Sequence, residues 1–163
     1  MEFFLYDLVV AQNIDSKSDE ELEKLEDKWM KNLRKYNEIY GTLSERLPQD
    51  IFNHFNSWGF HDYQLVKMEI EHTSLLHSDI HFTLSNNNKW RLSFEDVSFF
   101  QFKHLNYDNN TPIFNREVDS WLYEEFLPFD ESTLSFEVTF SSGGNILLHF
   151  PDKSVSLKKI NGT

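Results

Sequence analysis

Aromatic side chains dominate the apolar part of this sequence, and this composition restricts the folds that the chain can adopt. Its 163 residues include sixteen Phe, six Tyr and four Trp, but only one alanine, Ala11, and five glycines. Close-packed helical bundles rely on strong helix formers such as alanine, whereas aromatic and branched side chains favour β-strands. The length is typical of one domain. We therefore predict a single α+β domain over residues 1–163 with an aromatic core.

Apolar residues spaced three and four apart predict a long amphipathic helix in the first third of the chain. Its apolar positions are Leu22, Leu25, Trp29, Leu33, Tyr36, Tyr40, Leu43 and Leu47. Ser18 and Glu21 have the spacing of a capping box, which predicts that this helix begins near Ser18. Pro48 should end it, and a short second helix should follow. We expect the helical part to cover about residues 16–58, after an N-terminal strand at residues 3–11.

From Gln64 onward, apolar and polar residues alternate with the period of a β-strand. Alternating or apolar runs occur at residues 64–71, 79–84, 90–94, 98–102, 134–140, 146–150 and 155–157. Short turns between most of these runs require antiparallel pairing. The alternation slips at Glu95 and Asp96, which predicts a bulge or bend there. We predict that the helices pack on one curled antiparallel sheet of about six or seven strands over residues 63–160, interrupted by one long polar loop at residues 104–119.

The charge and the apolar pattern exclude several classes of protein. Asp and Glu number 27 against 15 Lys and Arg, so the net charge of −12 argues against a protein that binds nucleic acid through its phosphates. No apolar run approaches the roughly 20 residues that span a bilayer, and Glu2 and Asp7 stand where a signal peptide would carry basic residues. The absence of Cys excludes disulfides and Cys-based metal sites. We expect a cytoplasmic protein without a cofactor, a nucleic-acid partner or a membrane partner.

Two groups of residues have the types that metal sites and hydrolases use. His77, Asp79 and His81 alternate, so in a strand they share one face and could hold a divalent metal. That face is also the one expected to meet water, where neighbouring polar groups would satisfy them without an ion. The dipeptide His61-Asp62 resembles the signature of metal-dependent phosphohydrolases, but the further His and Asp residues that such enzymes need are missing. No metal site is therefore predicted, and the alternative is a small metal-dependent enzyme or ligand-binding protein that uses the sheet face around His77, Asp79 and His81.

Other catalytic patterns are also missing from the chain. Adjacent acids occur at Glu95-Asp96, Glu124-Glu125 and Asp130-Glu131. Glycosidases need two carboxylates that face each other across a substrate, whereas neighbours in a strand point to opposite faces. The sequence contains no nucleophile elbow and no glycine-rich phosphate loop. Its one pair of adjacent glycines, Gly143-Gly144, lies between two expected strands, where it forms a hairpin turn. These observations favour a binding protein over an enzyme.

The polar face of the expected sheet supplies a candidate partner site. Glu69, Glu71, Glu95 and Glu137 lie on this face by alternation, with few basic residues among them. Side chains that project together from neighbouring strands would repel one another, which raises their pKa values and favours a cationic partner. We predict that these four residues form a patch that binds a basic protein.

A loose resemblance supports the same class of function. Leu47-Pro48 ends the long helix, Phe60-His61-Asp62 leads into the sheet, and alternating strands follow from Val66, Met68 and Ile70. In these features residues 18–103 resemble small uncharacterised bacterial α+β proteins that are similar to immunity partners of polymorphic toxins. The resemblance implies an acidic inhibitor that occludes a basic toxin domain. A leucine is expected before the histidine in that group, and Phe60 stands there in this chain.

Overall fold

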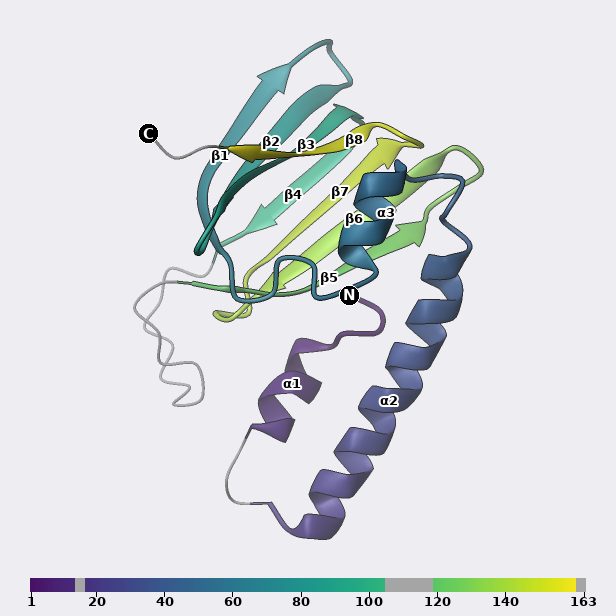
Figure 1. The fold of residues 1–163 in the computed structure, drawn as a ribbon, viewed down its shortest axis with the longest axis vertical. Helices are drawn as coiled ribbons and strands as arrows, with labels where there is room; N and C mark the ends of the chain where they lie inside the picture. The colour runs from purple at the N-terminus through teal and green to yellow at the C-terminus, as the bar shows by residue number, and fades with distance from the viewer. Residues whose placement is uncertain (14–16, 105–118, 161–163) are drawn as a thin grey trace.

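The computed structural model describes residues 1–13, 17–104 and 119–160, in which it has three helices and two antiparallel sheets (Figure 1). The helices are α1 (Tyr6–Gln12), α2 (Asp19–Gly41) and α3 (Gln49–Phe55). The strands are β1 (Gln64–His72), β2 (Ser78–Ser85), β3 (Lys89–Val97), β4 (Phe99–Lys103), β5 (Trp121–Pro128), β6 (Thr133–Phe140), β7 (Asn145–Pro151) and β8 (Val155–Ile160). The α+β class is confirmed. Residues 105–118, most of the predicted polar loop, lie outside the described residues.

Eight strands form two sheets of four, so the prediction of one sheet of six or seven strands is wrong. The first sheet has the order β1-β2-β3-β8, and the second has the order β4-β7-β6-β5. The chain passes from one sheet to the other between β3 and β4. There Asp96 has a positive φ of 53°, and Asp79 on β2 accepts a hydrogen bond of 3.0 Å from its backbone N–H. The bulge predicted at Glu95 and Asp96 is thus confirmed, and it turns the strand into the second sheet.

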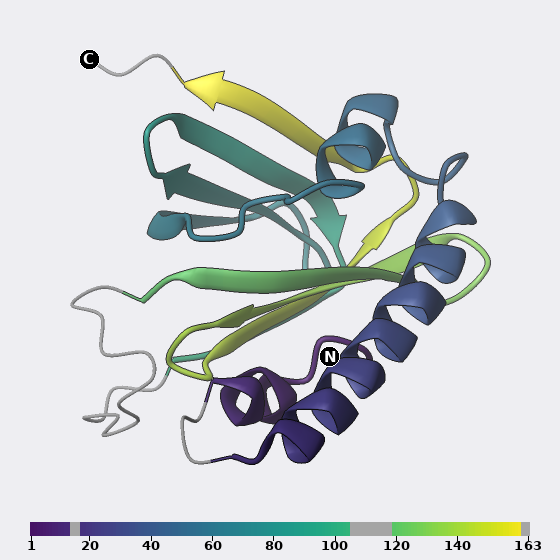
Figure 2. The same cartoon turned by 60° about the horizontal axis from the view of Figure 1, so that its bottom comes forward.

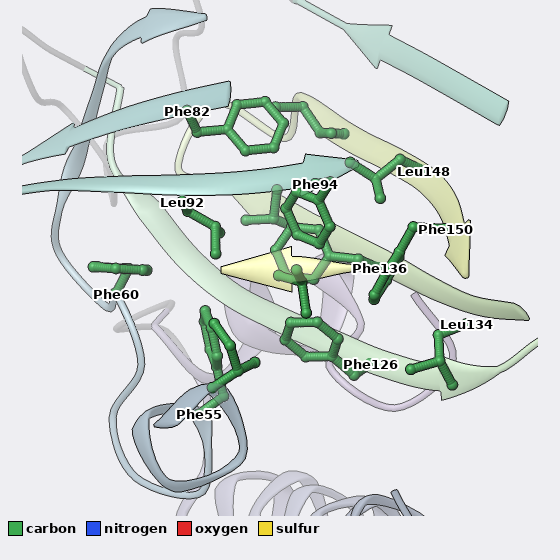
Figure 3. Close-up of a cluster of buried hydrophobic side chains, with 14 of the residues drawn as sticks. Phe55, Phe60, Phe82, Leu92, Phe94, Phe126, Leu134, Phe136, Leu148 and Phe150 are labelled. Carbon is green, nitrogen blue, oxygen red and sulfur yellow. The ribbon is translucent and has the colours of Figure 1, made fainter. Parts of the chain in front are cut away.

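The core lies between the two sheets and is mostly aromatic (Figure 3). Phe94 of the first sheet contacts Phe136 and Phe150 of the second, with ring centroids 4.9 Å apart in both pairs. Phe55 of α3 and Phe60, which follows it, extend this cluster at one side of the sheets. Large aromatic rings fill the space between the sheets, so close packing of this core does not require small residues such as alanine.

Helix α2 packs on the sheets mainly through its C-terminal half. Its capping box is present as predicted, since Ser18 and Glu21 each accept a hydrogen bond from the other's backbone N–H. Tyr36 and Tyr40 are its buried residues, while the N-terminal half extends beyond the sheets beside α1 (Figure 2). No helix in the described part of the chain is long and apolar enough to span a membrane.

The N-terminal strand predicted at residues 3–11 is wrong. Residues 6–12 form α1, and the residues before it run along β5. The side chain of Glu125 accepts hydrogen bonds from the backbone N–H groups of Glu2, Phe3 and Phe4, at 2.8, 2.7 and 2.6 Å. Consecutive N–H groups in a strand point in alternating directions, so a segment that turns three of them toward one carboxylate cannot join a ladder.

Candidate functional site

The site with the most unusual chemistry is a pocket between α2, β5 and the segment after α3. Its volume is about 360 Å³, at the small end of the range for ligand pockets. Its lining residues come from all three elements and from the N-terminal segment: Phe4, Trp29, Leu33, Tyr36, Asn37, Tyr40, Phe55, Asn56, Ser57, Trp58, His61, Leu122, Tyr123 and Glu124. We call this the Glu124 pocket, because Glu124 is its one acidic residue.

Glu124 lies in an environment that does not favour a charged carboxylate. Burial raises the pKa of its carboxyl group from the ordinary 4.5 to about 8, although a hydrogen bond from the Trp121 indole Nε1–H opposes this shift. Within the described residues, that indole is the one hydrogen-bond donor to the Glu124 carboxyl group, and no basic side chain forms an ion pair with it. The pocket therefore contains an acid without a counter-charge.

A β-bulge places Trp121 and Glu124 on the same side of the sheet. Trp121 pairs with Phe140 and Glu124 pairs with Val138, so the register shifts by one residue at Leu122. In a regular strand, residues three apart point to opposite faces, and the indole could not reach the carboxyl group. The bulge turns Glu124 inward, while Glu125 faces outward to the N-terminal segment. Two adjacent acids thereby have separate roles.

Gly59 provides the space that the Glu124 side chain occupies. Its φ is +52°, which glycine adopts readily and other residues rarely do. A Cβ atom at this position would lie 1.9 Å from Oε1 of Glu124, far inside van der Waals contact. The tight turn after α3 thus brings the backbone of Gly59 against the Glu124 carboxyl group. A larger residue at this position would displace the carboxyl group.

Replacing Gly59 with alanine is therefore expected to destabilise the protein by about 2 kcal/mol, from backbone strain and from the displaced carboxyl group. Chemical denaturation of Gly59→Ala, Glu124→Ala and the double variant measures the two contributions. Because Glu124→Ala removes the clash, Gly59→Ala should cost about 1 kcal/mol less in that background. Strictly additive effects would contradict the contact between Gly59 and Glu124.

The pocket walls are flat aromatic rings. Tyr123 contacts Trp29 at a centroid distance of 4.9 Å, Phe4 at 5.3 Å and His61 at 5.2 Å. Trp58 packs edge-on against His61 at 5.8 Å, but 79% of Trp58 is exposed. A large exposed indole at the rim of a pocket is typical of binding surfaces, where it can cover a ligand.

His61 also lines the pocket, beside Trp58 and Tyr123. Its Nδ1 lies 3.2 Å from Oδ2 of Asp62, so the two side chains of this dipeptide contact each other. Asp62 has a positive φ of 66°, which turns the chain toward β1. The dipeptide thus helps to form the pocket wall.

The four predicted partner-binding residues do not form one patch. Glu69 and Glu71 lie on β1 and Glu95 on β3, all in the first sheet, whereas Glu137 lies on β6 in the second. Glu137 contacts the amino group of Met1 at 2.5 Å and accepts a hydrogen bond of 3.0 Å from Asn145. The prediction of a common acidic face is therefore wrong.

The charge around Glu69 also differs from the prediction. Lys67 lies 2.9 Å from its carboxylate on the same strand, and Arg91 lies 3.5 Å away on β3. The hydrogen bond from Lys67 lowers the pKa of Glu69, helped by the positive charges of Lys67 and Arg91. Mutual repulsion was expected to raise it. The alternation already placed Lys67 and Arg91 on this face, but it did not predict that both would contact Glu69.

The alternative metal site at His77, Asp79 and His81 has no geometric support. His77 interacts with Ser74 at 3.2 Å, and His81 interacts with Ser93 at 2.9 Å. Asp79 accepts the hydrogen bond from Asp96 that holds the bulge. In residues 1–13, 17–104 and 119–160, no group of three or more His, Asp or Glu side chains is arranged to hold a metal ion.

Sequence reasoning did not single out the residues that form the Glu124 pocket. A signal was present, since Glu124 and Glu125 interrupt an otherwise apolar run at residues 121–127. Acids inside such a run are rarely buried without a specific partner or role. The bulge, which decides where each acid points, leaves no mark in the sequence.

Comparison of the chain with protein families, with curated proteins and with solved structures found no match. The function must therefore be argued from the site itself. An uncompensated acid among aromatic rings is suited to a cation that is weakly hydrated, because the rings attract positive charge and the acid can ionise to meet it.

Proposed function

We propose that this protein is an acidic binding protein of the immunity type, which holds a basic protein partner by taking one cationic side chain into the Glu124 pocket. The observation that carries the proposal is the Glu124 carboxyl group, which has one indole donor and no basic neighbour among the described residues. A cationic side chain would supply the missing charge. Its aliphatic part would lie against the aromatic walls, and the small volume suits one side chain rather than a large ligand.

The overall charge supports the same kind of partner. A net charge of −12 attracts basic proteins over a distance and raises their association rate, especially at low salt. Long-range attraction alone gives little specificity, whereas a pocket with a half-buried acid and a rim tryptophan can act as a binding hot spot. The general charge and the pocket would thus serve different steps of one association.

Affinity capture with immobilised wild-type protein and the Glu124→Gln variant tests the proposal. Glutamine keeps the shape of the side chain but cannot carry charge. We expect a partner with a basic isoelectric point to be retained by the wild type, and its purified form to bind Glu124→Gln at least about tenfold more weakly. Calorimetric titration of the purified partner measures this difference.

Glu131→Gln is the matched control, because it makes the same substitution at an exposed position in the turn between β5 and β6. It should slow association slightly and leave the dissociation rate unchanged. Equal loss of affinity in the two variants would show that overall charge, and not the pocket, holds the partner. Retention of an acidic partner that binds both variants equally would contradict the proposal.

A further inference from the structure

The walls of the Glu124 pocket restrict the kind of cation that it can hold. Trp29 and Tyr123 present their rings to the pocket, and Trp58 stands exposed at its rim. Besides Glu124, the lining side chains that can accept a hydrogen bond are the tyrosines, Asn37, Asn56, Ser57 and His61, and none of them is a carboxylate. A cation that enters must therefore exchange much of its hydration for contact with aromatic rings.

We infer that the Glu124 pocket binds a guanidinium group, carried by an arginine side chain of the partner. This inference rests on the proposed function and names the group that the site selects. Guanidinium is planar and weakly hydrated, so it stacks on aromatic faces while its edge donates hydrogen bonds to a carboxylate. A primary ammonium is strongly hydrated and compact, and it would lose more on entering the same walls.

Proton exchange gives this inference a distinctive signature. With a pKa of about 8, Glu124 is mostly protonated in the empty pocket at neutral pH. Arginine keeps its proton at any accessible pH, so a salt bridge requires Glu124 to release its own. The apparent affinity follows the ionised fraction of Glu124 and should rise about 50-fold between pH 6 and pH 8. A lysine can instead share or lose its proton on burial, which weakens this dependence.

Other titratable groups that line the pocket come from three elements. Tyr36 and Tyr40 face it from α2, and burial raises the pKa of each above the ordinary 10. Tyr123 on β5 has its pKa raised by burial and by Asp62. None of these tyrosines ionises between pH 6 and pH 8. His61 also lines the pocket, so the experiment must separate its contribution from that of Glu124.

Calorimetric titration with ethylguanidinium, ethylammonium and ethylurea tests the inference. Ethylurea matches ethylguanidinium in size and planarity but is neutral, whereas ethylammonium keeps the positive charge on a smaller, non-planar head group. We expect the wild type to bind ethylguanidinium about tenfold more tightly than ethylammonium, and ethylurea not measurably. Titrations in buffers of different ionisation enthalpy should show nearly one proton released per ethylguanidinium at pH 7. The NMR signal of the Trp121 indole N–H, identified with Trp121→Phe, should shift on binding.

Variants separate the contributions of the two titratable groups. Glu124→Gln should abolish ethylguanidinium binding and its pH dependence, whereas His61→Asn should keep both the binding and most of the proton release. Equal or tighter binding of ethylammonium would overturn the arginine assignment, as would ethylguanidinium binding without proton release. No binding of either cation by a folded wild type would overturn the site itself.

These outcomes also distinguish the inference from the proposed function. If ethylguanidinium binds through Glu124 but a purified partner binds wild type and Glu124→Gln equally, the site stands and the proposed function fails. If the partner requires Glu124 but the pocket does not prefer ethylguanidinium to ethylammonium, the proposed function stands and the inference fails. An arginine-to-lysine scan of the partner then identifies the residue that enters the pocket.

Discussion

Replacing Glu125 with alanine is expected to destabilise the protein by roughly 3 to 5 kcal/mol, a large part of the stability of a domain of this size. Glu125 is 1% exposed and accepts three backbone hydrogen bonds from the N-terminal segment. Alanine leaves three donors without partners, and each unsatisfied buried donor costs about 1 to 3 kcal/mol. Some of that cost disappears when the segment detaches and meets water, but Phe3 and Phe4 then leave the core.

Urea denaturation measures the change, and amide hydrogen exchange shows where it acts. The N–H groups of Glu2, Phe3 and Phe4 should lose protection first in Glu125→Ala. Glu125→Gln should lie between the wild type and Glu125→Ala, because an amide keeps one accepting oxygen. Glu131→Ala is the control and should change stability by no more than about 0.5 kcal/mol. A loss below about 1 kcal/mol in Glu125→Ala would mean that the carboxylate does not hold the segment.

The features that could be predicted from sequence are those that neighbouring residues determine. The capping box at Ser18 and Glu21 is completed within four residues, and the turn at residues 86–88 separates two alternating runs that pair as β2 and β3. Pro48 precedes the short helix α3 as predicted, although α2 ends at Gly41 and not at Pro48. In each case a local hydrogen bond or a dihedral preference decides the structure, so no tertiary contact was needed.

The errors arise where a distant residue decides the local structure. Residues 3–11 form a short apolar run, which periodicity cannot assign to a helix or a strand. Glu125, more than a hundred positions away, accepts hydrogen bonds from the N–H groups of residues 2–4, so these groups do not pair with a neighbouring strand. The positive φ of Asp96 divides one expected sheet into two. Alternation indicated the bend but could not show which strands lie on each side of it.

The candidate site was hidden for the same reason. An acid in a strand is normally assigned to the solvent face, and this rule holds for Glu71, whereas Glu124 lines the pocket. The bulge at Leu122 places Trp121 and Glu124 on the same side of the sheet. Gly59, from another part of the chain, leaves room for the Glu124 carboxyl group. The sequence therefore predicted an acidic patch on the sheet face and did not predict the Glu124 pocket.

Replacing Glu124 with glutamine is expected to make the protein more stable, by an amount that grows with pH. The pKa of Glu124 is about 8 in the folded protein and near 4.5 when the chain is unfolded. Below pH 4.5 both states hold the proton, so the carboxyl group has no effect on the pH dependence. Between 4.5 and 8 the unfolded state releases the proton and the folded state keeps it, so wild-type stability falls as pH rises. Glutamine has no proton to lose and can still accept the Trp121 hydrogen bond.

The gain should reach roughly 3 to 5 kcal/mol above pH 8, since each pH unit between the two pKa values contributes about 1.36 kcal/mol. Urea denaturation of both proteins at pH 5 and pH 9 measures it, with Glu131→Gln as the control that should follow the wild-type curve. Parallel curves for wild type and Glu124→Gln would mean that Glu124 is already ionised in the empty pocket. A variant that is more stable but no longer binds ethylguanidinium would show that Glu124 destabilises the fold and serves binding, as residues at functional sites commonly do.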